Sequence, residues 1–365
     1  MYMNSNFLVR PMSLHSLFKQ SQNSGKQVPM ISVLIVNFNA GAWLQSCLNA
    51  LARQDYGNFE AIILDNGSTD GSLESLILPD KRFNIYKFGR NLGFAAANNA
   101  GACIAKGTWL ATLNPDAFPE PHWLKELFAA TQKFTDSVMF GSTQWLYDRP
   151  GVLDGAGDCL FFTGRAWRGG FGHHSANLPP EGEIFSPCAA AALYRADVFK
   201  KAGGFRESLF CYNEDVDLGF RLRLMGHRAI QASKAEVRHV SSGISGKMSG
   251  FAAYHGQRNS IWVSIINMPW PLLVISLPAQ IFIETLLLTA KLPETLFGRR
   301  RVKKRKLWLS MARGFIHGFS GARLAWRERK CVQAKRTISA AAFASSICWS
   351  PFEFLRKAVH IKTTA

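Results

Sequence analysis

The chain has 365 residues, and 47% of them are hydrophobic, which excludes a wholly disordered protein. Its net charge of +18 is concentrated near the end, because residues 291–365 carry 18 Lys or Arg against three acids. We therefore expect a nearly neutral folded domain, followed by a basic region whose partner is anionic, either lipid headgroups or nucleic acid. The seven cysteines are scattered without a CxxC pair, which favours buried thiols in a reducing compartment over a disulfide framework or a zinc site.

Residues 1–29 contain no apolar segment of the kind that a secretory signal needs, so we interpret them as a flexible N-terminal extension. After them, strand and helix patterns alternate. Short β-branched or aromatic runs predict strands over 31–36, 59–64, 83–88 and 109–113. Helical spacing and capping residues predict helices over 42–53, from near Leu73, over 95–106 and over 218–224. The alternation predicts an α/β fold with a mostly parallel sheet flanked by helices.

Polar residues follow three of the predicted strands at the point where each strand ends. They are Asn37-Phe38-Asn39, Asp65-Asn66 and Asn114-Pro115-Asp116. Open α/β sheets bind ligands beyond the carboxyl ends of their strands, so the convergence predicts a site at one edge of the sheet. Residues 141–185 are rich in Gly and aromatic residues without a clear period, and we interpret them as a variable region over that site.

Six segments in order resemble the family 2 glycosyltransferases, which have the GT-A fold, and within them the rhamnosyltransferase-like and galactofuranosyltransferase-like branch. The segments are SVLIVNFN (32–39), LDNGSTDGS (64–72), GRNLGFAAANNAGA (89–102), LATLNPDAF (110–118), CYNEDVDLGFRLRLMGH (211–227) and AEVRHVSSG (235–243). Each segment alone is a weak signal, but six at plausible spacing are a strong one. The resemblance implies a GT-A catalytic domain over 30–250.

The resemblance also implies the catalytic acids. Asp215 would be the general base that takes the proton of the acceptor hydroxyl, and Glu214 would orient the acceptor or the backbone. A single in-line displacement would invert the configuration at the anomeric carbon. The alternative is structural, because acids near a helix N-terminus are common for electrostatic reasons.

A divalent metal is implied as well. Asn114-Pro115-Asp116 stands where the family has its DxD motif, so Asp116 would bind Mg²⁺ or Mn²⁺. His239 stands where this branch has a further metal ligand. The alternatives are a turn after the strand for the first and an ordinary core histidine for the second.

The resemblance places the nucleotide of the donor on a second group of residues. Phe38 would stack on the base, Asp65 would accept the N3–H of uracil or thymine, and Arg90 would contact the diphosphate or the base. The complete donor set is Phe38, Asn39, Asp65, Asn66, Arg90, Asn91, Asn98 and Asn114. Trp167 and Arg168 lie in the region expected to shape the acceptor site, with local packing of a Gly-rich loop as the open alternative.

Residues 251–365 are expected to form a basic, amphipathic helical region that associates with a membrane. The run 272–290 is nearly long enough to span a bilayer, but its polar interruptions fall along one side of a helix. They are Ser276, Gln280 and Glu284. This pattern favours a helix that lies in the interface or packs its polar side on protein, with the basic cluster 299–306 near anionic lipid, and a single span is the alternative.

Together these features predict an inverting glycosyltransferase at the cytoplasmic face of the inner membrane. The leading donor is dTDP-rhamnose, and UDP-hexose and UDP-galactofuranose are alternatives. The expected acceptor is a polyprenyl-diphosphate-linked or other glycolipid or polysaccharide of the cell surface. A non-catalytic GT-A scaffold with a lipid- or nucleic-acid-binding tail is the rival, although the region has no recognised nucleic-acid motif.

Overall fold

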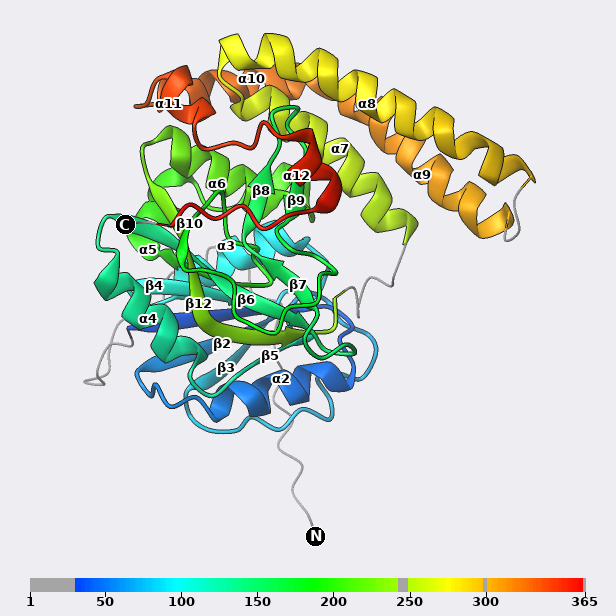
Figure 1. The fold of residues 1–365 in the computed structure, drawn as a ribbon. Coiled ribbons are helices and arrows are strands. Elements are labelled where there is room, and N and C mark those ends of the chain that lie inside the picture. Colours follow the sequence, from blue (N-terminus) through cyan, green and yellow to red (C-terminus); the bar gives the residue numbers. More distant parts are fainter. Residues whose placement is uncertain (1–29, 242–248, 298–300, 364–365) are drawn as a thin grey trace.

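A large mixed sheet with helices on both faces forms the main body of the molecule, and a group of long helices lies over one end of it (Figure 1). The computed structural model describes residues 30–241, 249–297 and 301–363. The extension predicted over 1–29 lies outside the described residues, as does part of the basic cluster 299–306.

The main sheet has ten strands, of which eight run side by side in the order β10-β12-β6-β11-β4-β1-β2-β3. Neighbouring pairs in the series β6, β12 and β4, β1, β2, β3 are parallel, whereas β11 is antiparallel to both β4 and β6. The strands are β1 (Ile31–Asn37), β2 (Phe59–Asp65), β3 (Phe83–Lys87), β4 (Trp109–Leu113), β5 (Ala117–Pro119), β6 (Ser137–Leu146), β7 (Leu153–Ala156), β10 (Gly182–Ile184), β11 (Ala191–Arg195) and β12 (Arg228–His239). A separate two-stranded ribbon pairs β8 (Asp158–Leu160) with β9 (Ala166–Arg168).

Helices of up to 11 residues cover the sheet, and four longer helices and two short ones follow it in the described chain. Those of the body are α2 (Ala42–Ala52), α3 (Phe94–Ile104), α4 (Trp123–Lys133), α5 (Ala196–Ala202), the 3₁₀ turn η1 (Glu207–Leu209) and α6 (Glu214–Leu224). Those that follow are α7 (Gly250–Asn267), α8 (Trp270–Phe297), α9 (Arg301–Ser320), α10 (Ala322–Ala334), α11 (Ala340–Ala344) and α12 (Pro351–Arg356). The predicted mostly parallel sheet flanked by helices is thus confirmed.

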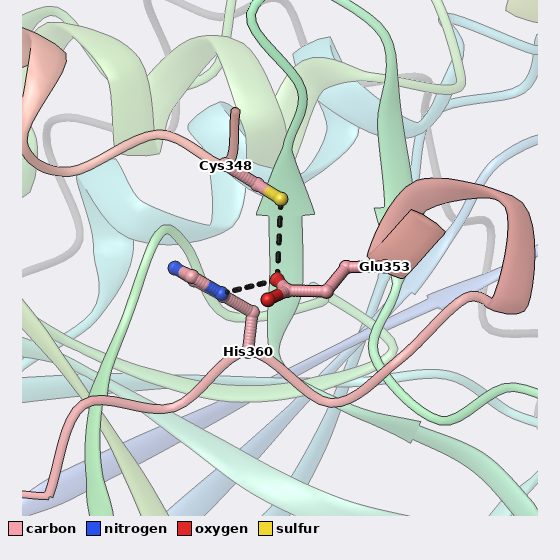
Figure 2. Close-up of side chains that lie close together, drawn as sticks. All are labelled: Cys348, Glu353 and His360. Atoms are coloured by element: carbon pink, nitrogen blue, oxygen red, sulfur yellow. Dashed lines mark hydrogen bonds and ion pairs between the residues drawn. The ribbon is translucent and has the colours of Figure 1, made fainter. Parts of the chain in front are cut away.

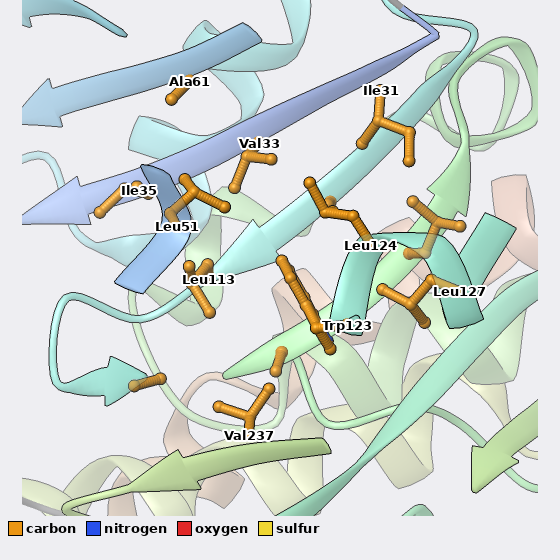
Figure 3. Packing of buried hydrophobic residues seen from close by; sticks show 14 of the residues in the cluster. Ile31, Val33, Ile35, Leu51, Ala61, Leu113, Trp123, Leu124, Leu127 and Val237 are labelled. Atoms are coloured by element: carbon orange, nitrogen blue, oxygen red, sulfur yellow. The ribbon is translucent and has the colours of Figure 1, made fainter. Parts of the chain in front are cut away.

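The core lies on both faces of β1, which is buried along its whole length. Successive side chains of a strand point to opposite faces. Val33 and Ile35 therefore pack with Trp123 of α4 in one apolar cluster (Figure 3), whereas Leu34 packs in a second cluster with α3 and α6. A strand that is buried on both faces is mostly apolar, which explains the apolar run from Val33 to Val36 in β1.

The helix predicted from near Leu73 is wrong, because residues 72–75 form only turns. The expected capping residue is present, and Asp70 accepts hydrogen bonds from the backbone N–H groups of Ser72 and Gly41. However, Pro79 follows within a few residues, and a proline disfavours helical backbone in the residue before it. The cap therefore fixes a loop against the start of α2.

The C-terminal helices pack on the body through α6. The ring of Phe220 in α6 stacks on Phe343 of α11 at a centroid distance of 4.6 Å, inside an apolar cluster that also contains residues of α7 and α10. Helices α8 and α9 run antiparallel beside each other and extend past the sheet (Figure 1). After α12 the chain returns to the edge of the main sheet, where Lys362 forms a bridge with Glu183 of β10.

Candidate active site

A cavity of about 750 Å³ lies beyond the ends of β1 and β4 and is bounded by α6, α7 and the ribbon β8–β9. Its lining includes Phe38, Asn39, Asn66, Asn91, Asn114, Asp116, Trp167, Arg168, Glu214, Asp215 and His239. The predicted catalytic, metal and acceptor residues therefore meet in one place, although they are far apart in the chain. Asp215 is 24 positions before His239 and about a hundred positions after Asp116. Asp65, Arg90 and Asn98 are not among the lining residues.

Asp116 and His239 are buried, line the cavity and contact each other. The His239 Nε2 atom lies 3.3 Å from Asp116 Oδ1 and 3.3 Å from the amide nitrogen of Asn114. Antiparallel pairing of β5 with the end of β12 brings them together, since Ala117 is opposite His239. Burial alone would lower the pKa of His239, but hydrogen bonds to Asp116 and Asp154 outweigh it and raise the pKa to about 9.

Asp154 of β7 is a residue that the sequence analysis missed, and it holds two of the predicted residues. Its Oδ2 atom lies 2.7 Å from His239 Nδ1 and 2.5 Å from Arg168 Nη1. Burial would raise the pKa of Asp154, but the charge of Arg168 and the hydrogen bond to His239 hold it well below its usual range. Because Asp154 occupies Nδ1, the Nε2 atom of His239 is the one that is presented to the cavity.

The first turn of α6 presents Glu214 and Asp215 to the same cavity. Asp215 Oδ2 accepts a hydrogen bond from the backbone N–H of Ala189 at 3.0 Å, and its Oδ1 accepts one from Val216 at 2.8 Å. Burial and the negative charge of Asp215 both raise the pKa of Glu214 and of Asp158, a second missed residue of the lining. Of these three acids, Asp215 is the one whose two carboxylate oxygens both accept backbone hydrogen bonds.

A strained loop delivers α6 to the cavity. Phe210, Tyr212 and Asn213 all have left-handed backbone conformations, with φ of 66°, 71° and 64°, which L-residues rarely adopt. The amide nitrogen of Asn259 in α7 lies 2.7–3.0 Å from the carbonyl oxygens of Leu209, Cys211 and Tyr212. Helix α7 thus fixes the loop from outside the body.

Several of the residues predicted to bind the donor form a rim of the cavity near the ends of β1 and β2. Phe38 is 36% exposed at this rim. The Asn66 amide donates to Asn91 Oδ1 at 3.0 Å and accepts the N–H of Leu92 at 2.8 Å, which fixes the loop that begins α3. Gly93 is required there, because a Cβ atom would come within 2.5 Å of the Phe210 ring.

Three residues predicted to bind the donor do not line the cavity, and each has a different environment. Asp65 is buried at the end of β2, where it accepts a hydrogen bond from Asn37 at 3.1 Å. Arg90 is exposed on the loop before α3. Asn98 is buried within α3, and its amide donates to the Phe94 carbonyl oxygen at 3.0 Å.

The opposite wall of the cavity carries Trp167 and Arg168 of β9. The same wall contains an ion pair between Arg165, which is partly exposed, and the buried Glu284 of α8, and both residues line the cavity. The three polar residues of α8 that interrupt its apolar run, Ser276, Gln280 and Glu284, are each 1% exposed. The predicted polar side of this helix therefore packs against protein.

Sequence comparison places the chain among known glycosyltransferases. Residues 32–203 match the model of the family described as glycosyl transferase family 2. The N-acetylglucosaminyl-diphospho-decaprenol L-rhamnosyltransferase of Mycobacterium tuberculosis is 24% identical over 254 residues, covering 62% of this chain and 81% of that protein. The chain spans only 25% to 56% of the length of several other curated relatives that it matches.

Solved structures agree on the fold. The mannosyltransferase PcManGT from Pyrobaculum calidifontis, in complex with GDP-Man and Mn²⁺, has a TM-score of 0.51 at 16% identity and covers 91% of both chains. A structure of GalNAc-T7 with UDP, GalNAc and Mn²⁺ has a TM-score of 0.54 at 15% identity and covers 66% of this chain and 48% of that one. The body has the GT-A fold, and residues 32–203 match the glycosyl transferase family 2 model.

Proposed function

We propose that this chain is an inverting glycosyltransferase that moves a sugar from a nucleotide-diphosphate donor to a lipid-linked acceptor. The observation that carries the proposal is that a single cavity contains both the buried Asp116–His239 pair and the acids at the start of α6. Asp116 and His239 suit a cation that in turn binds a diphosphate, and the acids of α6 suit the removal of a proton. Together they are the groups that a displacement at an anomeric carbon requires.

Asp116 and His239 would hold the divalent cation, Mg²⁺ or Mn²⁺. A carboxylate oxygen and a neutral imidazole nitrogen are suitable ligands for such ions. The two side chains fit this role, because they converge on one point and His239 otherwise retains a proton between two carboxylates. When bound, such an ion neutralises the charge that develops on a diphosphate leaving group.

Asp215 would act as the base. Its carboxylate removes the proton of the acceptor hydroxyl while that oxygen forms a bond to the anomeric carbon, and the bond from this carbon to the diphosphate oxygen breaks. The nucleotide diphosphate leaves with the bonding electrons. The hydrogen bonds from Ala189 and Val216 hold the Asp215 carboxylate in a fixed orientation before the acceptor arrives, and fixed geometry lowers the barrier to such a step.

The leading donor is dTDP-rhamnose, with UDP-linked hexose or galactofuranose as alternatives. The name of the Mycobacterium tuberculosis relative, an L-rhamnosyltransferase, supports this order. Phe38 stands at the exposed rim, where it can stack on a base, and Asn39, Asn66, Asn91 and Asn114 line the adjoining wall. The donor roles proposed for Asp65, Arg90 and Asn98 rest on the family resemblance alone.

The acceptor is proposed to be a polyprenyl-diphosphate-linked glycolipid, bound from the side of α8. This helix is long and apolar enough to cross a bilayer, over Trp270–Ala290. Its polar side is already packed on the cavity wall, which favours a helix lying in the interface. The apolar residues on its other side are exposed, namely Trp270, Val274, Ile275, Ile281, Phe282 and Leu286. We place this surface on the cytoplasmic leaflet of the inner membrane, beside the acceptor end of the cavity.

The test is transfer and donor hydrolysis with a panel of dTDP- and UDP-sugars, each with Mg²⁺, with Mn²⁺ and with a chelator. We expect one sugar nucleotide to be consumed much faster than the others, and only with metal present. An undecaprenyl-diphosphate glycolipid in anionic vesicles should serve better as acceptor than its water-soluble headgroup. Consumption of no donor under any condition would favour the scaffold alternative.

A further inference from the structure

The last described residues form a strap, residues 345–363, which returns from the C-terminal helices to the body. Its backbone is tied at several points: the N–H of Cys348 donates to the carbonyl oxygen of Leu160 at 2.7 Å, and the N–H of Gly170 donates to that of Lys357 at 2.7 Å. The strap therefore crosses the outer side of the ribbon β8–β9, whose residues line the cavity.

Three side chains of the strap converge on one point (Figure 2). The Cys348 Sγ atom lies 3.3 Å from Glu353 Oε2, and the His360 Nδ1 atom lies 2.8 Å from the same oxygen. One potential ligand atom of each residue lies within 4.8 Å of those of the other two. Cys348 is buried, Glu353 and His360 are partly exposed, and the second ring nitrogen of His360 is buried without a hydrogen-bond partner.

We propose that Cys348, Glu353 and His360 bind one transition-metal ion of the Zn²⁺ type, with water as the fourth ligand. Sulfur, imidazole nitrogen and carboxylate oxygen are the ligands that zinc takes in proteins. With bonds of about 2.3 Å to sulfur and about 2.0 Å to nitrogen and oxygen, neighbouring ligands of a tetrahedral ion lie roughly 3.3–3.6 Å apart. The three side chains reach that spacing by small movements, and the exposed side of the cluster admits the water.

The thiol is the group that changes most when such an ion binds. Burial, together with the hydrogen bond to Glu353, raises the pKa of Cys348 to about 11, so the thiol is protonated at neutral pH without a metal. Binding of zinc converts it to a thiolate and releases the proton to water. Zinc differs in ligand preference from the ion proposed at Asp116 and His239, because a thiolate disfavours Mg²⁺ and Mn²⁺.

The strap supports the wall of the cavity. The indole N–H of Trp167 donates to the carbonyl oxygen of Ala358 at 3.0 Å, and its ring meets the edge of the Phe354 ring at a centroid distance of 5.6 Å. Both strap residues lie between Cys348 and His360 in the chain, so an ion there would fix the segment that holds Trp167. The proposed metal site depends only on the geometry of Cys348, Glu353 and His360. Any consequence for an acceptor bound beside Trp167 would rest on the proposed function.

Metal content is the direct test. The full chain, purified without a metal-affinity tag and equilibrated with Zn²⁺ before dialysis, should retain one zinc per chain by mass spectrometry. Cys348→Ser and His360→Ala should each weaken Zn²⁺ binding at least about 100-fold, because even the loss of an outer partner of a metal ligand typically costs about 10–100-fold. Cys331→Ser, which removes an exposed thiol of α10, and Asp116→Ala should retain the zinc.

Thermal unfolding separates a metal site from a hydrogen-bonded cluster. Serine can still donate to Glu353 but is a poor zinc ligand, so a hydrogen-bonded cluster predicts equal unfolding temperatures for the parent and Cys348→Ser, with no effect of a chelator. The proposal predicts that a chelator lowers the unfolding temperature of the parent by a few degrees and leaves that of Cys348→Ser unchanged. Co²⁺ in place of zinc should give thiolate charge-transfer absorption that Cys348→Ser lacks.

A parent chain that retains no zinc and shows no Co²⁺ absorption overturns the proposal, as does full zinc retention by Cys348→Ser. Failure of the proposed function is a separate result. An inactive chain that still holds zinc leaves the metal site standing, and an active chain without zinc refutes only the metal site.

Discussion

The sheet edge and the C-terminal helices contribute to the same cavity in different ways. Short motifs place Asp116 at the sheet edge, between β4 and β5, and Asp215 in the first turn of α6, so the groups proposed to react lie in local sequence patterns. The helices contribute through single buried polar residues, such as Asn259 of α7 and Glu284 of α8. The difference indicates that the groups proposed to react belong to local motifs, whereas their positions depend on contacts with distant segments.

The largest effect should come from the sheet-edge side, with Asp215→Asn. Asparagine retains the shape but cannot accept the acceptor proton, and general base catalysis is typically worth about 10²–10⁴-fold. We expect kcat to fall by this factor while the dissociation constant of the donor, measured by calorimetry with metal present, stays within about twofold. Asp197→Asn is the matched control, because Asp197 is also an acid in the first turn of a helix, exposed and outside the cavity. Transfer that persists in Asp215→Asn would show that another group is the base.

A smaller effect is expected from Asp154→Asn, which keeps both proposed metal ligands, Asp116 and His239, but removes the charge that holds His239. The outer partner of a metal-bound histidine is typically worth about 10–100-fold in metal affinity. The concentration of Mn²⁺ needed for half-maximal transfer should rise by that factor, while the rate at saturating Mn²⁺ recovers. Asp136→Asn, which removes a surface ion pair with Arg228, is the control. If the Mn²⁺ concentration needed for half-maximal transfer does not change, His239 is not a ligand of the metal.

The contrast between local motifs and distant contacts also explains which parts of the molecule could be predicted from the sequence. The β1 and β4 strands, the α2 helix and the α/β class could be predicted, because strand runs and helical spacing are local signals. The meeting of Asp116 with His239 came from the family resemblance, since no local pattern relates residues 123 positions apart.

Asp154, Asp158 and Asn259 could not be predicted. The first two lie in the Gly-rich region 141–185, where short strands leave no periodic signal, and Asn259 is one polar residue of a helix whose partners are the carbonyl groups of a distant loop. The cluster of Cys348, Glu353 and His360 could not be predicted either, because spacings of five and seven residues between these residue types match no recognised motif. Only the fold brings these groups together.

Asn259→Ala tests whether the helices position the chemistry. The substitution leaves carbonyl oxygens of the strained loop without their donor, at a cost of about 1–3 kcal/mol in the free energy of unfolding. Because that loop precedes Asp215, we expect kcat to fall about tenfold with little change in donor affinity. Asn49→Ala on the exposed face of α2 should change neither quantity. A stability loss without a change in kcat would mean that α7 supports the fold and not the site.

The smallest effect should come from the exposed apolar surface of α8, whose residues do not line the cavity. Phe282 is 68% exposed on this surface, and moving a large apolar side chain from water into lipid is worth about 1.5–3 kcal/mol when burial is complete. Phe282→Ser should therefore weaken partition into anionic vesicles by about tenfold, because burial in an interface is partial. Ile77→Ser, at an exposed apolar position on the body far from α8, is the control. Donor hydrolysis in solution should be the same in both variants, since the cavity is unchanged. Transfer to a vesicle-bound acceptor should fall only in Phe282→Ser, and equal transfer by both would mean that α8 does not bring the cavity to the membrane.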